Sequence, residues 1–252
     1  TGYKARSMKK GSVLILGARS DIGMAVAHRF AQAGYDIQLA ARQASSLDDA
    51  RSDLQVRNSV MVTLHEFDAL NSQSHEAFVT ALPALPLIVV CTVGFMGEQK
   101  ENAVDMTAAS VVIRSNFEGP ANILGILANH FEHRGSGTLV GVSSVAGERG
   151  RASNYVYGAA KAGYTAFLSG LRNRLSRHNI NVVTVLPGFV DTKMTAGMQL
   201  PKLLTAQPAH VADAIFIAVT QGKNTIYIKS IWRLIMAVIR IIPETLFKRM
   251  TL

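Results

Sequence analysis

Short apolar runs alternate with longer segments of helical periodicity along most of the chain. The apolar runs have the length of strands and lie at residues 12–17, 35–41, 59–67, 87–92, 138–142, 181–186 and 225–229. The intervening segments repeat apolar residues at helical spacing and predict helices at 22–33, 47–56, 73–82, 103–115, 120–132, 155–177 and 210–220. Apolar strands that alternate with helices are typical of a parallel sheet buried on both faces. We therefore predict a doubly wound, parallel, seven-stranded Rossmann-type α/β sheet with helices on both faces.

The length of 252 residues suits one large α/β domain with a substantial core. No linker and no internal repeat interrupts the pattern, so we expect residues 8–230 to form a single domain. Residues 231–252 are predicted to be an apolar and basic helical extension of that domain. Because Met8 looks like the natural start, we interpret residues 1–7 as a cloning remnant, too short for a signal peptide.

The charge balance is basic, with 26 Lys and Arg against 17 Asp and Glu. Such a charge suits nucleic acid, an anionic membrane surface, or a phosphorylated substrate and cofactor. No basic run is interleaved with aromatic residues, so we expect no nucleic-acid partner. The single cysteine, Cys91, follows an apolar run and predicts a buried, inert thiol. One cysteine also excludes an internal disulfide, which fits the reducing cytoplasm.

A glycine-containing turn, GARSDIG from Gly17 to Gly23, joins the first strand to the first helix. Backbone amides at a helix N-terminus, with small residues that let a ligand approach, form an anion site for a pyrophosphate. A tight turn without a ligand is the alternative. The position after the first strand of a βαβ pattern favours a dinucleotide site.

Tyr157 and Lys161 are four residues apart in a predicted helix and therefore lie on one face. A free phenol has a pKa near ~10, and a nearby cation favours the phenolate, as a tuned acid/base requires. Ser144 follows a strand and would place its hydroxyl at the carboxyl edge of the sheet, near a substrate oxygen. Tyr-x-x-x-Lys alone is a weak pattern, and a solvated lysine is the alternative.

Five motifs together resemble the classical short-chain dehydrogenase/reductase family over nearly the whole chain. They are the turn Gly17–Gly23, Asp68, Asn116, Ser144 with Tyr157 and Lys161, and Pro187-Gly188 with Thr192. The spacing of thirteen residues between Ser144 and Tyr157 matches the family and singles out Ser144 over Ser143. The resemblance implies an oxidoreductase that transfers a hydride between a nicotinamide cofactor and a carbonyl or secondary alcohol, without a metal.

The resemblance also implies a role for each site residue. Tyr157 would be the general acid/base, Ser144 would orient the substrate oxygen, and Lys161 would lower the pKa of Tyr157 and bind the nicotinamide ribose. Asn116 would sit in a helix kink and hold a proton-relay water. The implied cofactor contacts are Gly17, Arg19, Ser20, Asp21, Ile22, Gly23, Arg42, Asp68, Gly94, Tyr157, Lys161, Pro187, Gly188, Val190 and Thr192.

Simpler roles remain open at three of these positions: Asn116 and Thr192 as caps, and Asp68 as a turn former. The second strand ends in Ala40-Ala41-Arg42, without the acid typical of NAD enzymes of this fold, which favours NADPH over NADH. Asp21 replaces a usual glycine and would repel a pyrophosphate unless its side chain caps the helix and turns away.

The ending IYIKSIWRLIMAVIRIIPETLFKRM is similar to that of the reductases acting on decaprenylphosphoryl keto-pentose. This similarity implies a polyprenyl-phosphate-linked or phosphorylated keto-sugar as substrate. A reductase of soluble ketones or 3-oxoacyl thioesters is one alternative. A non-catalytic nucleotide-binding sensor or scaffold is the other, although the intact set of site residues argues against it.

Residues 231–242 are too short and too charged to cross a bilayer. They suit a helix lying on the inner face of the membrane, with Trp232 at the headgroups and basic residues meeting phosphates, or a wall of an apolar substrate channel. A homo-oligomer interface, in a dimer or tetramer, is the alternative. Arg149 and Arg151 lie where a substrate phosphate could pass, or else on a solvated loop. The basic residues of the tail are Arg233, Arg240, Lys248 and Arg249.

Overall fold

The computed structural model describes residues 10–250, so the predicted remnant at 1–7 and residues 251–252 lie outside the described chain. Parallel strands form one seven-stranded sheet in the order β3-β2-β1-β4-β5-β6-β9. The predicted Rossmann-type sheet is thereby confirmed. Its strands are β1 (Ser12–Leu16), β2 (Asp36–Ala41), β3 (Val62–Glu66), β4 (Ile88–Cys91), β5 (Gly137–Val142), β6 (Ile180–Pro187) and β9 (Thr225–Ile228).

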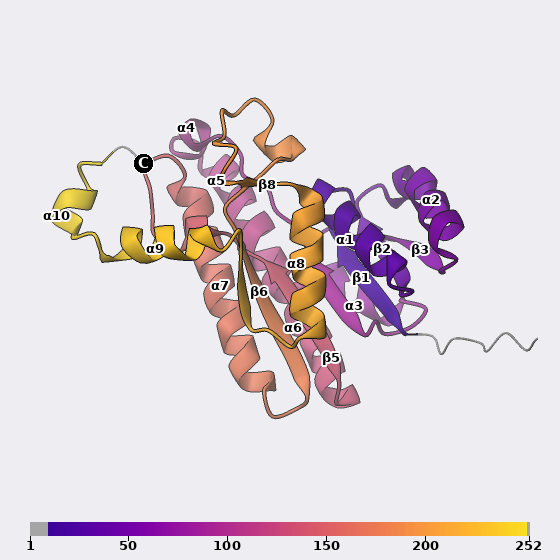
Figure 1. Ribbon diagram of the computed structural model, residues 1–252. Helices are drawn as coiled ribbons and strands as arrows, with labels where there is room; N and C mark the ends of the chain where they lie inside the picture. Colours follow the sequence, from indigo (N-terminus) through magenta and orange to yellow (C-terminus); the bar gives the residue numbers. More distant parts are fainter. Residues whose placement is uncertain (1–9, 251–252) are drawn as a thin grey trace, which may run out of the picture.

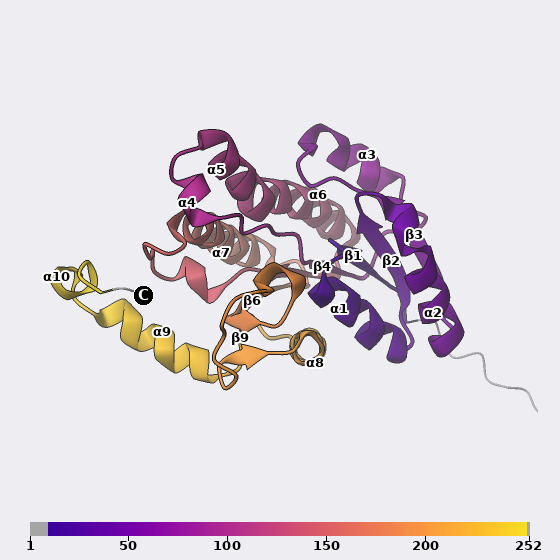
Figure 2. The same cartoon turned by 90° about the horizontal axis from the view of Figure 1, so that it is seen from above.

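Helices cover both faces of the sheet (Figures 1 and 2). Successive strand residues point to opposite faces, so Val13 and Ile15 pack in one layer and Leu14 and Leu16 in the other. Both sets are fully buried, which explains why successive residues of β1 are apolar rather than alternating with polar ones. The first layer contains α1 (Asp21–Gln32), α2 (Asp48–Asn58) and α8 (Pro208–Thr220), and the second contains α3 (His75–Thr80), α6 (Gly119–Arg134) and α7 (Tyr155–Leu175).

The chain runs outward from β1 to β2 and β3, then returns to the other side of β1 to form β4. The loops after β1 and β4 therefore diverge and leave a crevice at the carboxyl edge of the sheet, the usual ligand site of such folds. The short elements at this edge and beyond it are η4 (Val145–Gly147), η5 (Lys193–Thr195), α4 (Gln99–Asn102), β7 (Phe189–Val190), β8 (Thr205–Ala206) and α10 (Glu244–Phe247), with η1 (Ala44–Leu47) and η2 (Ser72–Ser74) elsewhere.

The predicted helices at 103–115 and 120–132 are joined in the structure. α5 (Met106–Ile113) continues through a π-helical turn, η3 (Arg114–Glu118), into α6. Pro120 has no N–H to donate, and it directly follows the π-helical turn, where the regular hydrogen-bond ladder of the helix is already interrupted. Gly119 lies where an added Cβ would be 2.3 Å from the carbonyl oxygen of Ala69. The wide turn is therefore followed directly by a residue that packs closely on the loop containing Ala69.

The C-terminal helix α9 (Ile231–Ile241) leaves the edge of the sheet beyond β9 and extends away from the other helices, with α10 at its far end (Figure 2). It is anchored by Trp232 and Met236, which pack with Val145 and Leu186. The prediction that Trp232 reaches lipid headgroups is wrong, because its side chain is 4% exposed and its Nε1 donates to the carbonyl of Leu204 at 3.1 Å. Within residues 10–250 no helix is both long and apolar enough to traverse a bilayer.

Candidate active site

Ser144, Tyr157 and Lys161 converge at the carboxyl edge of β5. Ser144 caps the 3₁₀ turn η4, and Tyr157 and Lys161 lie in the first turns of α7, which packs on η4. The hydroxyl of Ser144 hydrogen-bonds the phenol of Tyr157. The ammonium of Lys161 lies 5.7 Å from the centre of the Tyr157 ring and donates to the carbonyl of Val142 at 3.0 Å. The structure thus brings all three predicted groups together.

Burial changes the proton affinity of two of these groups. It raises the pKa of Tyr157 to about 12, although the hydrogen bond with Ser144 opposes the change. Burial also lowers the pKa of Lys161 to about 8. The lowered tyrosine pKa that the resemblance implied is therefore not found, since desolvation of the phenolate outweighs the opposing hydrogen bond with Ser144. At neutral pH Tyr157 keeps its proton and Lys161 its charge, so the site presents a proton donor beside a cation.

The two neighbouring serines have different surroundings. The hydroxyl of Ser143 donates to the carbonyl of Lys161 at 3.0 Å and lies 2.7 Å from the hydroxyl of Thr165, which ties β5 to α7. The Ser144 hydroxyl instead accepts from the backbone N–H of Ala146 and contacts Tyr157. This difference agrees with the spacing argument that favoured Ser144.

Asn116 lies in the π-helical turn, so the kink expected there is present, and its side chain is fully buried. Its Nδ2 donates to the carbonyls of Phe95 and Val112, and its Oδ1 accepts from the N–H of Phe95 at 3.2 Å. An added Cβ on Gly94 would be 2.9 Å from Oδ1 of Asn116 and 3.5 Å from Nζ of Lys161. Asn116 therefore holds the loop that follows β4 close to Lys161.

The glycine turn is held in shape by hydroxyl groups. Ser20 caps α1 and accepts from the N–H of Gly23 at 2.9 Å. The hydroxyl of Thr92 donates to the carbonyl of Gly17 and lies 2.9 Å from the hydroxyl of Ser20. An added Cβ on Gly23 would be 2.7 Å from the oxygen of Gly17, so the turn closes only around a glycine.

Asp21 does not cap α1, because Ser20 holds that position. Its carboxylate accepts from the N–H of Lys193 at 2.7 Å and lies 3.9 Å from the Lys193 ammonium. This contact, which the sequence did not predict, turns the Asp21 carboxylate toward the segment after β7 and pairs its negative charge with Lys193. The expected repulsion between Asp21 and a pyrophosphate is thereby relieved.

Two arginines meet at the end of β2. The guanidinium of Arg19 donates to the side chain of Gln43 at 3.1 Å and to the carbonyl of Arg42 at 3.4 Å. Glu66, which pairs with Ala41 in the sheet, accepts from the backbone N–H groups of Gln43 and Ala44. These bonds lower the pKa of Glu66 and keep its carboxylate occupied. The edge of β2 therefore offers exposed cations where an NAD enzyme would offer a free acid.

Asp68 forms the turn that was its alternative role. Its carboxylate accepts from the N–H of Leu70 at 3.0 Å, and its carbonyl lies 3.1 Å from Nε2 of His75. Four predicted site residues do not line the cavity beside Tyr157: Asp68, the exposed Arg19 and Arg42, and the buried Asn116. Of the glycine turn, Ile22 lines the cavity, whereas Gly17, Ser20, Asp21 and Gly23 form its supporting framework.

A cavity of about 650 Å³ opens beside Tyr157. The predicted residues in its wall are Ile22, Gly94, Ser144, Tyr157, Lys161, Pro187, Gly188, Val190 and Thr192. Sequence patterns did not single out Thr92, Gln99, Asn154, Met194 and Met198, which also line it. Trp232 completes the wall, because an added Cβ on Gly188 would lie 2.0 Å from its ring. Only the folding back of the C-terminal segment brings that tryptophan here.

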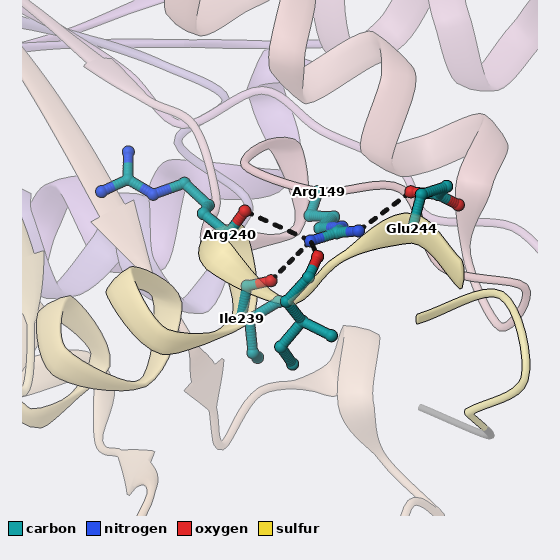
Figure 3. Close-up of polar contacts among 5 residues, drawn as sticks. Arg149, Ile239, Arg240 and Glu244 are labelled. Atoms are coloured by element: carbon teal, nitrogen blue, oxygen red, sulfur yellow. Dashed lines mark hydrogen bonds and ion pairs between the residues drawn. The ribbon is translucent and has the colours of Figure 1, made fainter. Parts of the chain in front are cut away.

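Arg149 does not face a substrate phosphate. Figure 3 shows its guanidinium at the end of α9, where it donates to the carbonyls of Ile239, Arg240 and Ile242 and pairs with Glu244 at 2.9 Å. It thereby satisfies the free carbonyls at the negative end of the helix dipole. Arg149 fixes the C-terminal segment to the loop that precedes α7.

The fold and the site together define a class of protein. A doubly wound sheet with a glycine turn after β1 is typical of a Rossmann-type dinucleotide domain, and the Ser–Tyr–Lys cluster after β5 adds an acid/base site. Residues 11–202 match the short chain dehydrogenase family. An uncharacterized oxidoreductase of Mycobacterium tuberculosis is 36% identical over 241 residues, which cover 94% of this chain and 96% of the relative. The chain belongs to the short-chain dehydrogenase family of NAD(P)-dependent oxidoreductases.

Solved structures show the same fold. A short-chain dehydrogenase from Sphingobium yanoikuyae in complex with NADPH matches with a TM-score of 0.80 at 24% identity, over 92% of this chain and 96% of that one. A short chain dehydrogenase from Burkholderia cenocepacia in complex with NADP matches with a TM-score of 0.82 at 20% identity, over 96% and 97% of the two chains.

Proposed function

We propose that the protein catalyses the NADPH-dependent reduction of a carbonyl group, or the reverse oxidation of a secondary alcohol. The observation that supports this proposal most directly is the protonated phenol of Tyr157, which is hydrogen-bonded to Ser144 in the wall of the cavity. A bound NADPH would supply the hydride for the carbonyl carbon. Tyr157 gives its proton to the carbonyl oxygen, and Ser144 donates a hydrogen bond to the same oxygen. The Lys161 charge stabilises the negative charge that develops on these oxygens.

The residues around the glycine turn fit such a cofactor. The N-terminus of α1 and the close packing at Gly23 suit a pyrophosphate, and the arginines at the end of β2 suit a 2′-phosphate. The residues at the end of β6 and just after it also line the cavity and would hold the nicotinamide: Pro187, Gly188, Val190 and Thr192. Lys161 would bind its ribose.

Replacing both Arg19 and Arg42 with alanine tests the choice of cofactor. A charge-assisted hydrogen bond to the 2′-phosphate is worth about 1.5–3 kcal/mol. The loss of one such bond from each arginine is therefore expected to raise the Kd for NADPH roughly 100- to 10,000-fold, whereas the Kd for NADH changes little. Fluorescence titration of both cofactors measures the two constants. Arg177→Ala removes an exposed arginine near the end of α7 and serves as control. Tighter binding of NADH than of NADPH by the unaltered protein contradicts this proposal.

For the substrate, we propose a polyprenyl-phosphate-linked or phosphorylated keto-sugar, in the manner of the decaprenylphosphoryl keto-pentose reductases that the C-terminal sequence resembles. The basic charge balance supports an anionic substrate. Exposed Met194 and Met198 at the cavity, together with Trp232, offer apolar contact to a substrate with a lipid portion.

We further propose that the protein is cytoplasmic and contacts the inner face of the membrane through α9. The outer face of this helix exposes Ile231, Leu234, Val238 and Ile241, opposite the buried Trp232 and Met236. Exposed basic residues at Arg233, Lys248 and Arg249 suit anionic headgroups.

Flotation with vesicles that contain anionic lipid tests this contact. We expect the unaltered protein to float and the variant Leu234→Glu/Val238→Glu to remain behind, because a charge on the apolar face opposes insertion. Val56→Glu, at an exposed valine of α2, is the matched control. Equal flotation of all three proteins refutes the membrane contact. A change of oligomeric mass in the double variant assigns the face to a second copy instead.

A further inference from the structure

The part of the cavity wall that comes from the loop before α7 and from α4 contains buried polar atoms without partners. Within residues 10–250, Nε of Arg151, Oδ1 of Asn154 and Nε2 of Gln99 have no hydrogen-bond partner. All three side chains line the cavity beside Tyr157. A buried polar group that lacks a partner costs about 1–3 kcal/mol. Three such groups on one wall indicate a site that a polar ligand completes.

Within the part of the chain that the structure describes, Arg151 lacks the hydrogen bonds that two other partly buried arginines make. Arg134 donates to the carbonyls of Leu85, Pro86 and Ser136, and Arg172 donates to Val182, Thr184 and Asn224. Arg149, two residues before Arg151, is occupied by the end of α9. Burial lowers the pKa of Arg151, and its buried Nε donates to no partner within residues 10–250. The desolvated cation is therefore available to a ligand.

The charges of the wall favour an anion at this place. Its cationic side chains are Arg151, Lys100 and Lys161, whereas Glu98 is the acid among the described residues that line it. The wall is also fixed in position, since the side-chain oxygen of Gln99 accepts from the N–H of Val156 at 3.2 Å and links α4 to α7. This bond holds Gln99 beside the first turn of α7, which carries Tyr157, and Arg151 precedes Tyr157 by six residues along the chain.

We propose that Arg151 and Gln99 bind an oxyanion that the substrate carries beside its carbonyl group, and that Asn154 accepts a hydrogen bond from a substrate hydroxyl. The donors of Arg151 and Gln99 match the acceptor oxygens of a phosphate, sulfonate or carboxylate, and the free oxygen of Asn154 requires a donor. This subsite rests on the proposed function, because it gives the substrate of that same site its chemical class: a hydroxylated carbonyl compound with an anionic group.

Binding of three probes to the NADP⁺-loaded protein tests the subsite without turnover. Geraniol, geranyl phosphate and methyl phosphate separate the contributions of the chain and the phosphate. Trp232, the single tryptophan, lines the cavity, and its fluorescence reports binding. We expect geranyl phosphate to bind about 10- to 100-fold more tightly than geraniol, as a charge-assisted pair provides. The ratio of the Kd for geraniol to the Kd for geranyl phosphate is expected to fall to near one in Arg151→Met and to keep an intermediate value in Arg151→Lys.

Arg177→Met, which removes an exposed charge near the end of α7, serves as control and keeps the preference. Two results would overturn the subsite. One is equal affinity of the unaltered protein for geraniol and geranyl phosphate, and the other is an equal loss of affinity for both ligands in Arg151→Met. Tighter binding of geranyl phosphate than of methyl phosphate assigns the anion to a lipid-borne source, and equal binding assigns it to a soluble phosphate. The binding assay does not depend on reduction of a carbonyl. If the protein prefers geranyl phosphate to geraniol through Arg151 but reduces no carbonyl compound, the proposed function is refuted and the subsite is still supported.

Discussion

The variant Tyr157→Phe is expected to lose about 100- to 10,000-fold in kcat, the contribution of a positioned proton donor. The phenol of Tyr157 is the protonated group in the cavity wall that contacts Ser144, and its pKa of about 12 keeps it a donor at neutral pH. Phenylalanine fills the same space and removes only the hydroxyl, so cofactor binding should remain within about twofold of the original. Oxidation of NADPH, followed at saturating substrate, measures kcat.

Tyr155→Phe provides the matched control for this prediction. Tyr155 begins the same helix, two residues earlier, but its side chain is 46% exposed and does not line the cavity. We expect its kcat to stay unchanged. An unaffected rate in Tyr157→Phe removes the proposed mechanism, and a protein that binds NADPH but reduces no carbonyl would be a nucleotide-binding sensor or scaffold.

The second large effect is expected on stability, from Trp232→Ala. The indole is buried against Gly188, packs edge to face on Phe189 at 5.3 Å and donates to the carbonyl of Leu204. Truncating a buried tryptophan costs about 3–5 kcal/mol of the free energy of unfolding, because a cavity remains. The same change removes a wall of the substrate cavity. Urea unfolding, followed by circular dichroism, measures the loss.

Leu234→Ala is the control on the same helix, since Leu234 is 67% exposed and contributes about 0.5 kcal/mol or less. Trp232→Phe keeps part of the packing and loses the hydrogen bond, so its stability should lie between the two. A loss below about 1 kcal/mol in Trp232→Ala would show that α9 is not anchored by this residue.

The alternation of apolar runs and helical periodicity was enough to predict the parallel sheet. Strands buried on both faces must be apolar throughout, and Leu14 and Val13, on opposite faces, meet that requirement equally. The same local logic fails at element ends. Residues 59–61 continue an apolar pattern, but Ser59 adopts a left-handed conformation with φ of 54° that ends α2, so β3 begins only at Val62.

The candidate site was predictable where a motif lies within one or two consecutive elements. Ser144, Tyr157 and Lys161 are brought together by η4 and the start of α7, which are adjacent in the chain, so their spacing already defined their geometry. The glycine turn is likewise local. The direction of the tyrosine pKa shift could not be predicted from the motif, because burial by the whole fold outweighs the hydrogen bond with Ser144.

The roles of Arg149, Arg151, Asp21 and Trp232 were decided by tertiary structure alone. Arg149 and Arg151 look alike in the sequence, yet one meets carbonyls 90 or more residues away and the other faces the cavity without a partner. Asp21 finds its partner 172 residues later, at Lys193. Sequence periodicity records which face of an element is apolar. It does not record which distant segment folds against that face, and at this site the distant segment determines which charges remain free for a substrate.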